Sequence, residues 1–232
     1  MSLSLWAQYF MDNYATVAEA VADLEARPFH VVTKDVPMQP GRLTTVHLSL
    51  SDAGGDSAIL EWIDGTLQIH HGPEYKVMTN DPPYDEQLAL TAYWQGINPR
   101  EMLPGTTRAA DRFVRARTYV DMVVQSDDPR EAAAAAFSVI RNASVPYGIS
   151  TPDAPNLSTT RWRVVADQKD RLFYVESAIS PNVFWVDLKK LDFAAGGGAR
   201  MLDLGVDMQS IRSGEVSAEF VPAPPFQFEP GE

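Results

Sequence analysis

The sequence predicts an α+β fold in which two antiparallel sheets stack between layers of helices. Three observations support this prediction. The expected elements run in the order helices, strands, helices, strands. The turns within the first block of strands are too short for the crossovers that parallel strands need. Helices that are separated from antiparallel strands along the chain are typical of the α+β class.

The front of the chain is expected to be helical. Residues 3–11 are rich in Leu, Trp, Tyr and Phe, which predicts a buried helix. Thr16 and Glu19 then match a capping box ahead of apolar residues at helical spacing. Arg27-Pro28 should end this second helix, because the residue before a proline avoids helical backbone angles. We expect a strand at residues 29–33 and a turn-rich stretch at residues 37–41.

The first block of strands begins where the apolar period changes to two. Val46, Leu48 and Leu50 alternate with polar residues, which indicates a half-buried strand. Asp64-Gly65 is the strongest short hairpin signal in the chain. The expected antiparallel strands are residues 45–51, 58–63, 66–70 and 75–79.

The second half repeats the order of helices and then strands. Asp128 and Pro129 match a helix start, with an acid at the positive end of the helix dipole. The expected helices are residues 84–95, 108–124 and 129–143, and the expected strands are residues 161–167, 172–177 and 183–186. Nothing marks a linker between separate cores, so we predict one domain over residues 1–232, with an extended tail over about 194–232.

Composition excludes several classes of function. The 232 residues are 45% apolar, carry a formal net charge of −12, and include no cysteine. The negative charge argues against nucleic acid or an anionic membrane as partner. Without cysteine the chain cannot supply a disulfide, a thiolate zinc site or a thiol nucleophile. No membrane span or signal peptide is visible in the sequence, so the compartment stays open between cytoplasm and periplasm.

General motifs for catalysis or metal binding are weak. His70 and His71 are neighbours on an expected strand, where successive side chains point to opposite faces, so a shared metal is unfavourable. Two glycosylation sequons, Asn142-Ala143-Ser144 and Asn156-Leu157-Ser158, are short patterns that are frequent by chance. We therefore expect no metal and no cofactor.

Asn80 has two interpretations. It lies in the run Thr79-Asn80-Asp81-Pro82-Pro83, directly after an expected strand. The structural interpretation is a strand end with an Asn turn and a proline stop. The functional interpretation is an amide, held at the strand end, that donates its N–H to a developing oxyanion.

Arg112 also has two interpretations. Arg108, Arg112 and Arg115 fall on one stripe of the expected helix, opposite an apolar stripe that includes Phe113 and Val114. From composition alone we favour a solvated arginine face, in which Asp111 and Arg115 pair at the i, i+4 spacing.

Several short motifs, each weak alone, follow one another in a distinctive order. The series is Leu48-Ser49-Leu50-Ser51-Asp52, Gly55-Asp56-Ser57-Ala58-Ile59-Leu60-Glu61, Asp64-Gly65, Val77-Met78-Thr79-Asn80-Asp81-Pro82, Leu103-Pro104-Gly105, Arg112-Phe113-Val114-Arg115, Asn142-Ala143-Ser144-Val145-Pro146 with Gly148, Thr160-Arg161-Trp162 with Asp167, Phe173-Tyr174, Val186-Asp187-Leu188 and Leu191-Asp192-Phe193. This order resembles the choloylglycine hydrolase family, which contains conjugated bile salt hydrolases and penicillin V acylases. The resemblance covers about residues 12–193.

The resemblance implies the αββα sandwich of amino-terminal nucleophile hydrolases and hydrolysis of a linear amide. In that family a cysteine at the mature amino terminus attacks the carbonyl, and its own α-amino group acts as base. Asn80 matches the Asn whose side chain helps to form the oxyanion hole, and Arg112 matches an Arg beside the nucleophile. The implied partner is a small N-acyl amide: a conjugated bile salt, penicillin V or an acyl-homoserine lactone.

The departure from the family pattern is at the front. Met1 aligns inside the pattern, so we expect the first strands, the nucleophilic Cys, and an Arg and an Asp of the site to be missing from residues 1–232. Ser2 is not expected to replace the cysteine, because a helical pattern follows it. The sequence leaves two hypotheses: an amide hydrolase whose nucleophile lies outside these residues, and an inactive binding or scaffold protein derived from the family.

The same resemblance also bears on the expected quaternary structure and substrate. The stretch between Asn80 and Arg112 is short, as in the Gram-negative branch of the family, which includes penicillin V acylases and enzymes acting on acyl-homoserine lactones. Many Gram-positive bile salt hydrolases have an extra hairpin for tetramer assembly in this region. We expect a homo-oligomer, since an exposed sheet edge without the first strands favours self-association.

Overall fold

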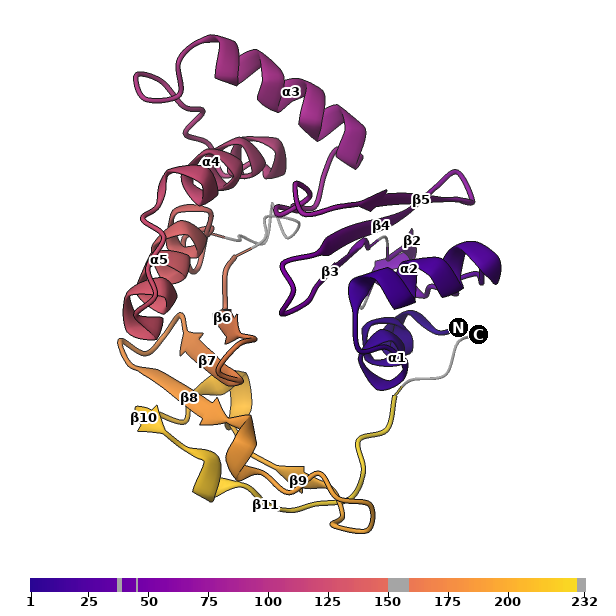
Figure 1. Ribbon diagram of the computed structural model, residues 1–232, viewed down its shortest axis with the longest axis vertical. Coiled ribbons are helices and arrows are strands. Elements are labelled where there is room, and N and C mark those ends of the chain that lie inside the picture. Colours follow the sequence, from indigo (N-terminus) through magenta and orange to yellow (C-terminus); the bar gives the residue numbers. More distant parts are fainter. Residues whose placement is uncertain (37–38, 45, 150–158, 229–232) are drawn as a thin grey trace. The chain divides into compact units, whose positions relative to one another are not determined.

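The computed structural model describes residues 1–36, 39–44, 46–149 and 159–228, and the chain divides into two compact units. The first unit contains Met1–Tyr93 with Gln227 and Phe228, and the second contains Trp94–Phe226. Figure 1 shows the elements of each unit, coloured along the sequence. The single domain expected over residues 1–232 stays a prediction.

Two helices open the first unit, as predicted. A short 3-10 turn, Leu3–Leu5, leads into α1 (Trp6–Asn13), and α2 follows at Val17–Ala26. The capping box is confirmed: the Glu19 backbone N–H donates to Thr16 Oγ1 over 3.2 Å, and the Thr16 N–H donates to the Glu19 carboxylate over 3.2 Å. This reciprocal pair satisfies two backbone donors that the start of α2 would otherwise leave exposed.

A three-stranded antiparallel sheet in the order β3-β4-β5 forms the centre of the first unit. Its strands are β3 (Leu48–Ser51), β4 (Ser57–Ile63) and β5 (Thr66–His71). The β4–β5 hairpin turns at Asp64 and Gly65, whose φ angles of 49° and 77° are the positive values of the tight turn predicted from this dipeptide.

The core of the first unit forms where α1 and α2 pack on this sheet. The side chains of Trp6 and Phe10 from α1 and Leu24 from α2 cluster with Ala58 and Leu60 of β4, and all five are 4% exposed or less. Ring contacts extend this cluster, since the Trp6 and Trp62 ring centroids lie 5.0 Å apart. Apolar burial of this kind is the main source of stability for such a unit.

Two strands predicted for the first unit are wrong. Residues 29–33 form only an isolated bridge between Val32 and Ser2, and residues 75–79 form no ladder. Of the turn-rich stretch expected at residues 37–41, residues 37 and 38 lie outside the described residues. The rest of it belongs to β2 (Gln39–Leu43), which pairs with β1 (Asp35–Val36). At residues 75–79 the chain leaves the sheet, because the Tyr75 N–H closes a turn on Gly72 O at 3.1 Å.

The second unit is built from two helices, α4 (Ala109–Met122) and α5 (Pro129–Asn142), and a four-stranded sheet. The sheet order is β10-β8-β7-β6, with bounds β6 Trp162–Asp167, β7 Leu172–Ser177, β8 Val183–Asp187 and β10 Gly214–Glu215. The three longer strands are antiparallel, as predicted. β10 pairs with β8 in parallel, which is a correction to the purely antiparallel expectation.

Helices and sheet of the second unit pack in sequence order: α4 contacts α5, and α5 contacts β6 (Figure 1). On the sheet, Val175, Phe184, Val186 and Val216 form a buried cluster. Asp128 caps α5 as predicted, since its side chain accepts the Arg130 N–H at 2.8 Å. The remaining helix, α3 (Tyr84–Gly96), begins in the first unit and ends in the second.

The end of the chain contains more regular structure than the extended tail that was expected. β9 (Arg200–Met201) pairs with β11 (Val221–Pro222), and three 3-10 turns lie at Leu188–Lys190, Val206–Met208 and Ser217–Glu219. Within the described ranges, none of the helices combines the length and the apolar character that crossing a membrane would require.

Candidate active site

Asn80 lies on an exposed turn between β5 and α3, in the first unit. The sequence interpretation placed it at the end of a strand, but the preceding residues 75–79 are not in a strand. Val77 anchors this segment, since it is 7% exposed. The segment that carries Asn80 is therefore not part of a sheet.

Gln87, the fourth residue of α3, binds the turn that carries Asn80. Its side chain is buried at 1% exposure and makes three hydrogen bonds with the turn. Nε2 donates to the Pro82 carbonyl at 2.6 Å and to the Thr79 carbonyl at 3.3 Å, while Oε1 accepts from Thr79 Oγ1 at 2.6 Å. These contacts fasten the residue before Asn80 and the second residue after it.

Glu61, in the middle of β4, holds the start of α3. One carboxylate oxygen accepts the backbone N–H of Tyr84 at 3.0 Å, and the other lies 2.8 Å from His47 Nδ1. Glu61 is 2% exposed and Tyr84 is equally buried. A carboxylate beside the first helical N–H groups is favourable, because these groups carry the positive end of the helix dipole. Glu61 thereby ties α3 to the central strand of the sheet.

Arg112 is half-buried on the first turn of α4, in the second unit. Its Nε donates to the Thr107 carbonyl at 3.1 Å. Burial lowers the pKa of the Arg112 guanidinium, and the neighbouring charge of Arg115 lowers it further. A lowered pKa here means that the charge is poorly solvated, although arginine keeps its proton. Such a cation is well suited to stabilise an incoming negative charge.

Arg115 corrects the prediction of a solvated arginine face. It is 9% exposed, and its Nη1 donates to the carbonyls of Pro104 and Thr106, both at 2.8 Å. Asp111, its expected partner at i, i+4, instead accepts from the Thr106 hydroxyl and backbone N–H. The apolar stripe was predicted correctly, since Phe113 and Val114 are 0% and 1% exposed.

The two predicted site residues belong to different units: Asn80 to the first and Arg112 to the second. The surroundings of the two residues have the same arrangement. In each, the candidate side chain, exposed for Asn80 and half-buried for Arg112, lies beside a backbone turn. A buried side chain binds the carbonyls of that turn, Gln87 in one case and Arg115 in the other.

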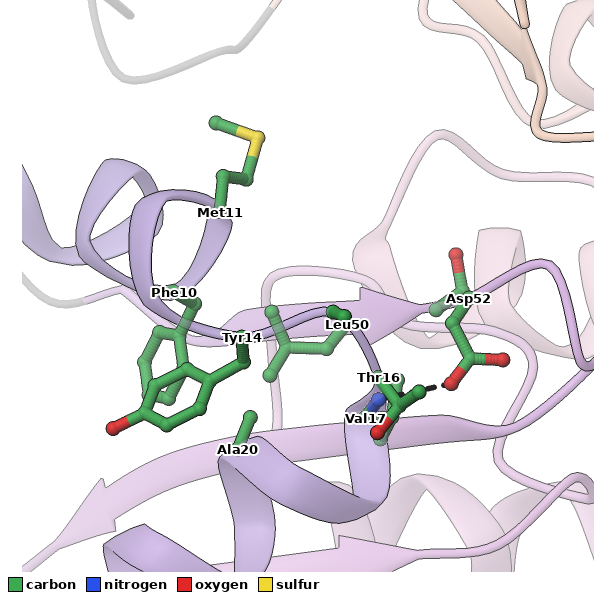
Figure 2. Close-up of a pocket in the computed structure, with 10 residues that line it drawn as sticks. Phe10, Met11, Tyr14, Thr16, Val17, Ala20, Leu50 and Asp52 are labelled. Atoms are coloured by element: carbon green, nitrogen blue, oxygen red, sulfur yellow. Dashed lines mark hydrogen bonds between the residues drawn. The ribbon is translucent and has the colours of Figure 1, made fainter.

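Two hollows of the first unit lie elsewhere. Figure 2 shows one of about 100 Å³ between α1, α2 and the end of β3, where the Val17 N–H donates to the Asp52 carboxylate at 2.9 Å. The other, of about 480 Å³, is lined mainly by apolar side chains that include Phe29, Trp62 and Leu67. Among the described residues, Asn80 and Arg112 line neither hollow.

The histidine pair and the first glycosylation sequon have structural surroundings. His71 Nε2 lies 2.8 Å from Asp56, and His70 stacks against Tyr84 with ring centroids 4.8 Å apart. Over the described part of the chain, no group of three or more metal-ligating side chains converges. Asn142 of the first sequon ends α5, and the second sequon, at residues 156–158, falls outside the described residues.

Comparison with known proteins shows the family. Residues 1–209 match the model of the linear amide C–N hydrolases, choloylglycine hydrolase family. The chain belongs to the choloylglycine hydrolase family. This confirms the family indicated by the ordered motifs, and the mixed α+β architecture with antiparallel sheets agrees with that of solved family structures.

Within the choloylglycine hydrolases, the chain is similar to penicillin V acylases. It is 54% identical to one from Pectobacterium atrosepticum, over 98% of this chain and 64% of that protein. The solved structure of a penicillin V acylase from Agrobacterium tumefaciens has a TM-score of 0.88 at 54% identity, covering 99% of this chain and 69% of the other. The chain thus spans just under two thirds of the curated relative.

A conjugated bile acid hydrolase from Clostridium perfringens shares the fold at a greater distance. Its solved structure has a TM-score of 0.65 at 19% identity, covering 83% of this chain and 64% of the other. At this level of identity the likeness concerns the fold alone.

Sequence reasoning missed the residues that hold the candidate site residues in place, namely Gln87, Glu61 and Arg115. One signal for Gln87 was present: with Thr91 it puts polar residues at the i, i+4 spacing on the face of α3 that also carries Tyr84. A polar residue on an inward helix face needs a partner, and that partner was the turn that carries Asn80.

Proposed function

We propose that the protein hydrolyses the side-chain amide of penicillin V or of a closely related N-acyl amide. The observation that carries this proposal is the 54% identity to a penicillin V acylase over 98% of this chain. Membership of the family supports the coarser activity, hydrolysis of linear amide C–N bonds. The bile acid hydrolase likeness at 19% identity supports no particular substrate.

In the proposed reaction a thiolate attacks the amide carbonyl and the oxygen becomes an oxyanion. Asn80 Nδ2–H donates a hydrogen bond to this oxyanion, which stabilises the transition state more than the ground state. Arg112 supplies a poorly solvated positive charge that stabilises the thiolate and the tetrahedral intermediate. Collapse of the tetrahedral intermediate breaks the amide C–N bond, and the amine leaves with the proton that the nucleophile's own α-amino group took from the thiol. Water then hydrolyses the acyl thioester, which releases the carboxylic acid and restores the thiol.

The nucleophile of this reaction must come from outside residues 1–232, because these residues include no cysteine. The 232-residue chain alone is therefore expected to show no turnover. The test is an assay with penicillin V, conjugated bile salts and acyl-homoserine lactones, on this chain and on the product of the same reading frame extended upstream of Met1. Turnover by the 232 residues alone, abolished by Asn80→Ala, would contradict the expected inactivity.

The zero cysteine count also favours the second hypothesis, an inactive binding or scaffold protein. An upstream in-frame Cys, followed closely by Arg and Asp, favours the hydrolase, whereas an upstream stop codon close to Met1 favours the scaffold. Self-association also remains a proposal. Light scattering tests it, and a monomer at high concentration would contradict it.

A further inference from the structure

We propose that Gln87 is the positioning residue for the candidate oxyanion donor Asn80. The inference deepens the proposed function and rests on it for the role of Asn80. Its own content is structural: the buried amide of Gln87 binds the backbone on both sides of Asn80, in a segment that is not part of a sheet.

The turn that carries Asn80 lies outside the sheet. The residues before it, 75–79, form no ladder with the sheet, and the turn itself is exposed at Asn80 and Asp81. An exposed turn that is not paired in a sheet opens easily unless side chains bind its backbone. An oxyanion donor needs the opposite property, because misplacement by about 1 Å costs roughly a hundredfold in rate.

Gln87 binds the turn through both donors and the acceptor of its side-chain amide. Its side-chain amide offers two donors and one acceptor. The two donors reach the carbonyls of Thr79 and Pro82, and the acceptor receives the Thr79 hydroxyl. The amide thus bridges both sides of Asn80 from a site that is 1% exposed. A hydrogen bond in such a water-excluded site is stronger and more directional than one in solvent.

Gln87 is itself held in place by the contacts at the start of α3. It lies one turn after Tyr84, whose N–H is bound by Glu61 of the central strand β4. Its own backbone N–H donates to Pro83 O at 3.1 Å, within the first turn of the helix. A continuous path therefore runs from the sheet through Glu61 and α3 to Gln87, and from there to the turn. Asn80 is held from the helix that follows it.

The test measures backbone amide exchange in the 232-residue chain, which needs no turnover. Gln87→Leu keeps a side chain of comparable volume but removes all three hydrogen bonds. Exchange at Asn80 and Asp81 is expected to rise by roughly tenfold or more relative to the rest of the first unit. Thr91→Val is the matched control, because Thr91 lies one turn further on the same face, is 4% exposed, and its hydroxyl has no partner in the described structure.

Two milder variants keep the test decisive if Gln87→Leu does not fold. Thr79→Val removes the hydroxyl bond to Gln87 and leaves both donors of Gln87 on the carbonyls, whereas Gln87→Glu keeps an acceptor for Thr79 but loses both donors. Exchange at Asn80 should therefore increase in the order wild type, Thr79→Val, Gln87→Glu. Unchanged exchange in both variants, or a rise spread evenly over the first unit, would overturn the proposal.

Turnover provides the second readout, in whichever form of the protein is active. Gln87→Leu should lower kcat by roughly a hundredfold while KM changes little, because the donor it misplaces acts only in the transition state. Gln87→Glu should recover part of this loss. If Gln87→Leu loosens the turn but the wild-type chain extended upstream of Met1 shows no turnover, the positioning stands and the proposed function is contradicted. Normal kcat in Gln87→Leu would overturn the positioning.

Discussion

The surroundings of Asn80 and of Arg112 reach a similar arrangement by different means. Asn80 sits on an irregular turn, and a neutral amide, Gln87, binds the carbonyls of that turn. Arg112 sits on a regular helix, and a charged side chain, Arg115, binds the carbonyls of the turn ahead of that helix. The difference predicts that the first arrangement is insensitive to charge, whereas the second depends on buried cations.

The largest expected effect is on turnover and comes from Asn80→Ala. Loss of an oxyanion donor lowers kcat by about 10²–10³-fold, whereas the exposed side chain contributes little to folding. We therefore expect the free energy of unfolding to change by less than about 0.5 kcal/mol. Kinetics in the active form and urea unfolding of both proteins check this. Asn13→Ala, which alters an exposed amide at the end of α1, serves as the control. An equal loss of kcat in Asn80→Ala and Asn13→Ala would show that Asn80 has no specific role in catalysis.

The next largest effect separates Arg115 from Arg112. Arg115→Met should destabilise the protein by about 2–4 kcal/mol, because it leaves the bound carbonyls of the preceding turn unsatisfied. Arg112→Met should cost less than about 1 kcal/mol of stability, since Arg112 is half-buried and its removal relieves a repulsion between like charges, which offsets part of the loss of the hydrogen bond to the Thr107 carbonyl.

The kinetic control for this pair lies on the same helix. Arg117 pairs with Asp121 at 3.0 Å on the outer part of α4, so Arg117→Met removes a charge from α4 without touching the turn. We expect turnover to fall with Arg112→Met and to stay near the wild-type value with Arg117→Met. Equal stability losses for Arg112→Met and Arg115→Met would break the distinction between a functional arginine and a structural one.

How far the sequence could predict these arrangements depends on the range of the signal. Thr16 with Glu19, and Asp64 with Gly65, were predicted correctly because each signal is complete within a few neighbouring residues. The position of Arg112 on a helix followed from the apolar period around Phe113.

The carbonyl-binding roles of Gln87 and Arg115 could not be found in this way. Arg115 binds Pro104, which lies eleven residues earlier, and its sequence pattern equally fits a pair with Asp111. The strand predicted at residues 75–79 failed for a different reason. Its composition suits a strand, but the turn at Gly72 directs the chain away from the sheet. A local turn thus decided the strand, whereas longer-range contacts decided the arginine face.

The acid response sharpens the contrast in charge between the two units. Glu176, 8% exposed on β7, receives hydrogen bonds from Arg141 of α5 at 2.7 Å and from Arg163 of β6 at 3.1 Å. Burial raises the pKa of Glu176, but the two arginines outweigh it and hold the pKa below its ordinary value. The native state then binds fewer protons than the unfolded state as the pH falls through the glutamate range.

It follows that this contribution of Glu176 is present above the ordinary glutamate pKa of about 4.3 and is lost as the pH falls through the lower native pKa. We expect Glu176→Gln to cost about 1–3 kcal/mol at pH 7, and to give a flatter stability curve than wild type below about pH 4.5. Exchange in α5 should rise in wild-type protein over that range. The bonds of Gln87 contain no titrating group. Parallel stability curves for variant and wild type would contradict the assignment.

The smallest expected effect is that of Thr91→Val, which tests whether α3 tolerates change away from Gln87. Thr91 is 4% exposed, and its hydroxyl has no hydrogen-bond partner in the described structure. Replacing a buried, unsatisfied hydroxyl by a methyl group of similar size removes a desolvation cost, so the variant should be neutral or more stable by up to about 1 kcal/mol. Thermal unfolding measures this, with amide exchange at Asn80 expected to be unchanged. If Thr91→Val instead loosens the Asn80 turn as much as Gln87→Leu, then the turn responds to any change in the buried face of α3, and the specific role of the Gln87 amide fails.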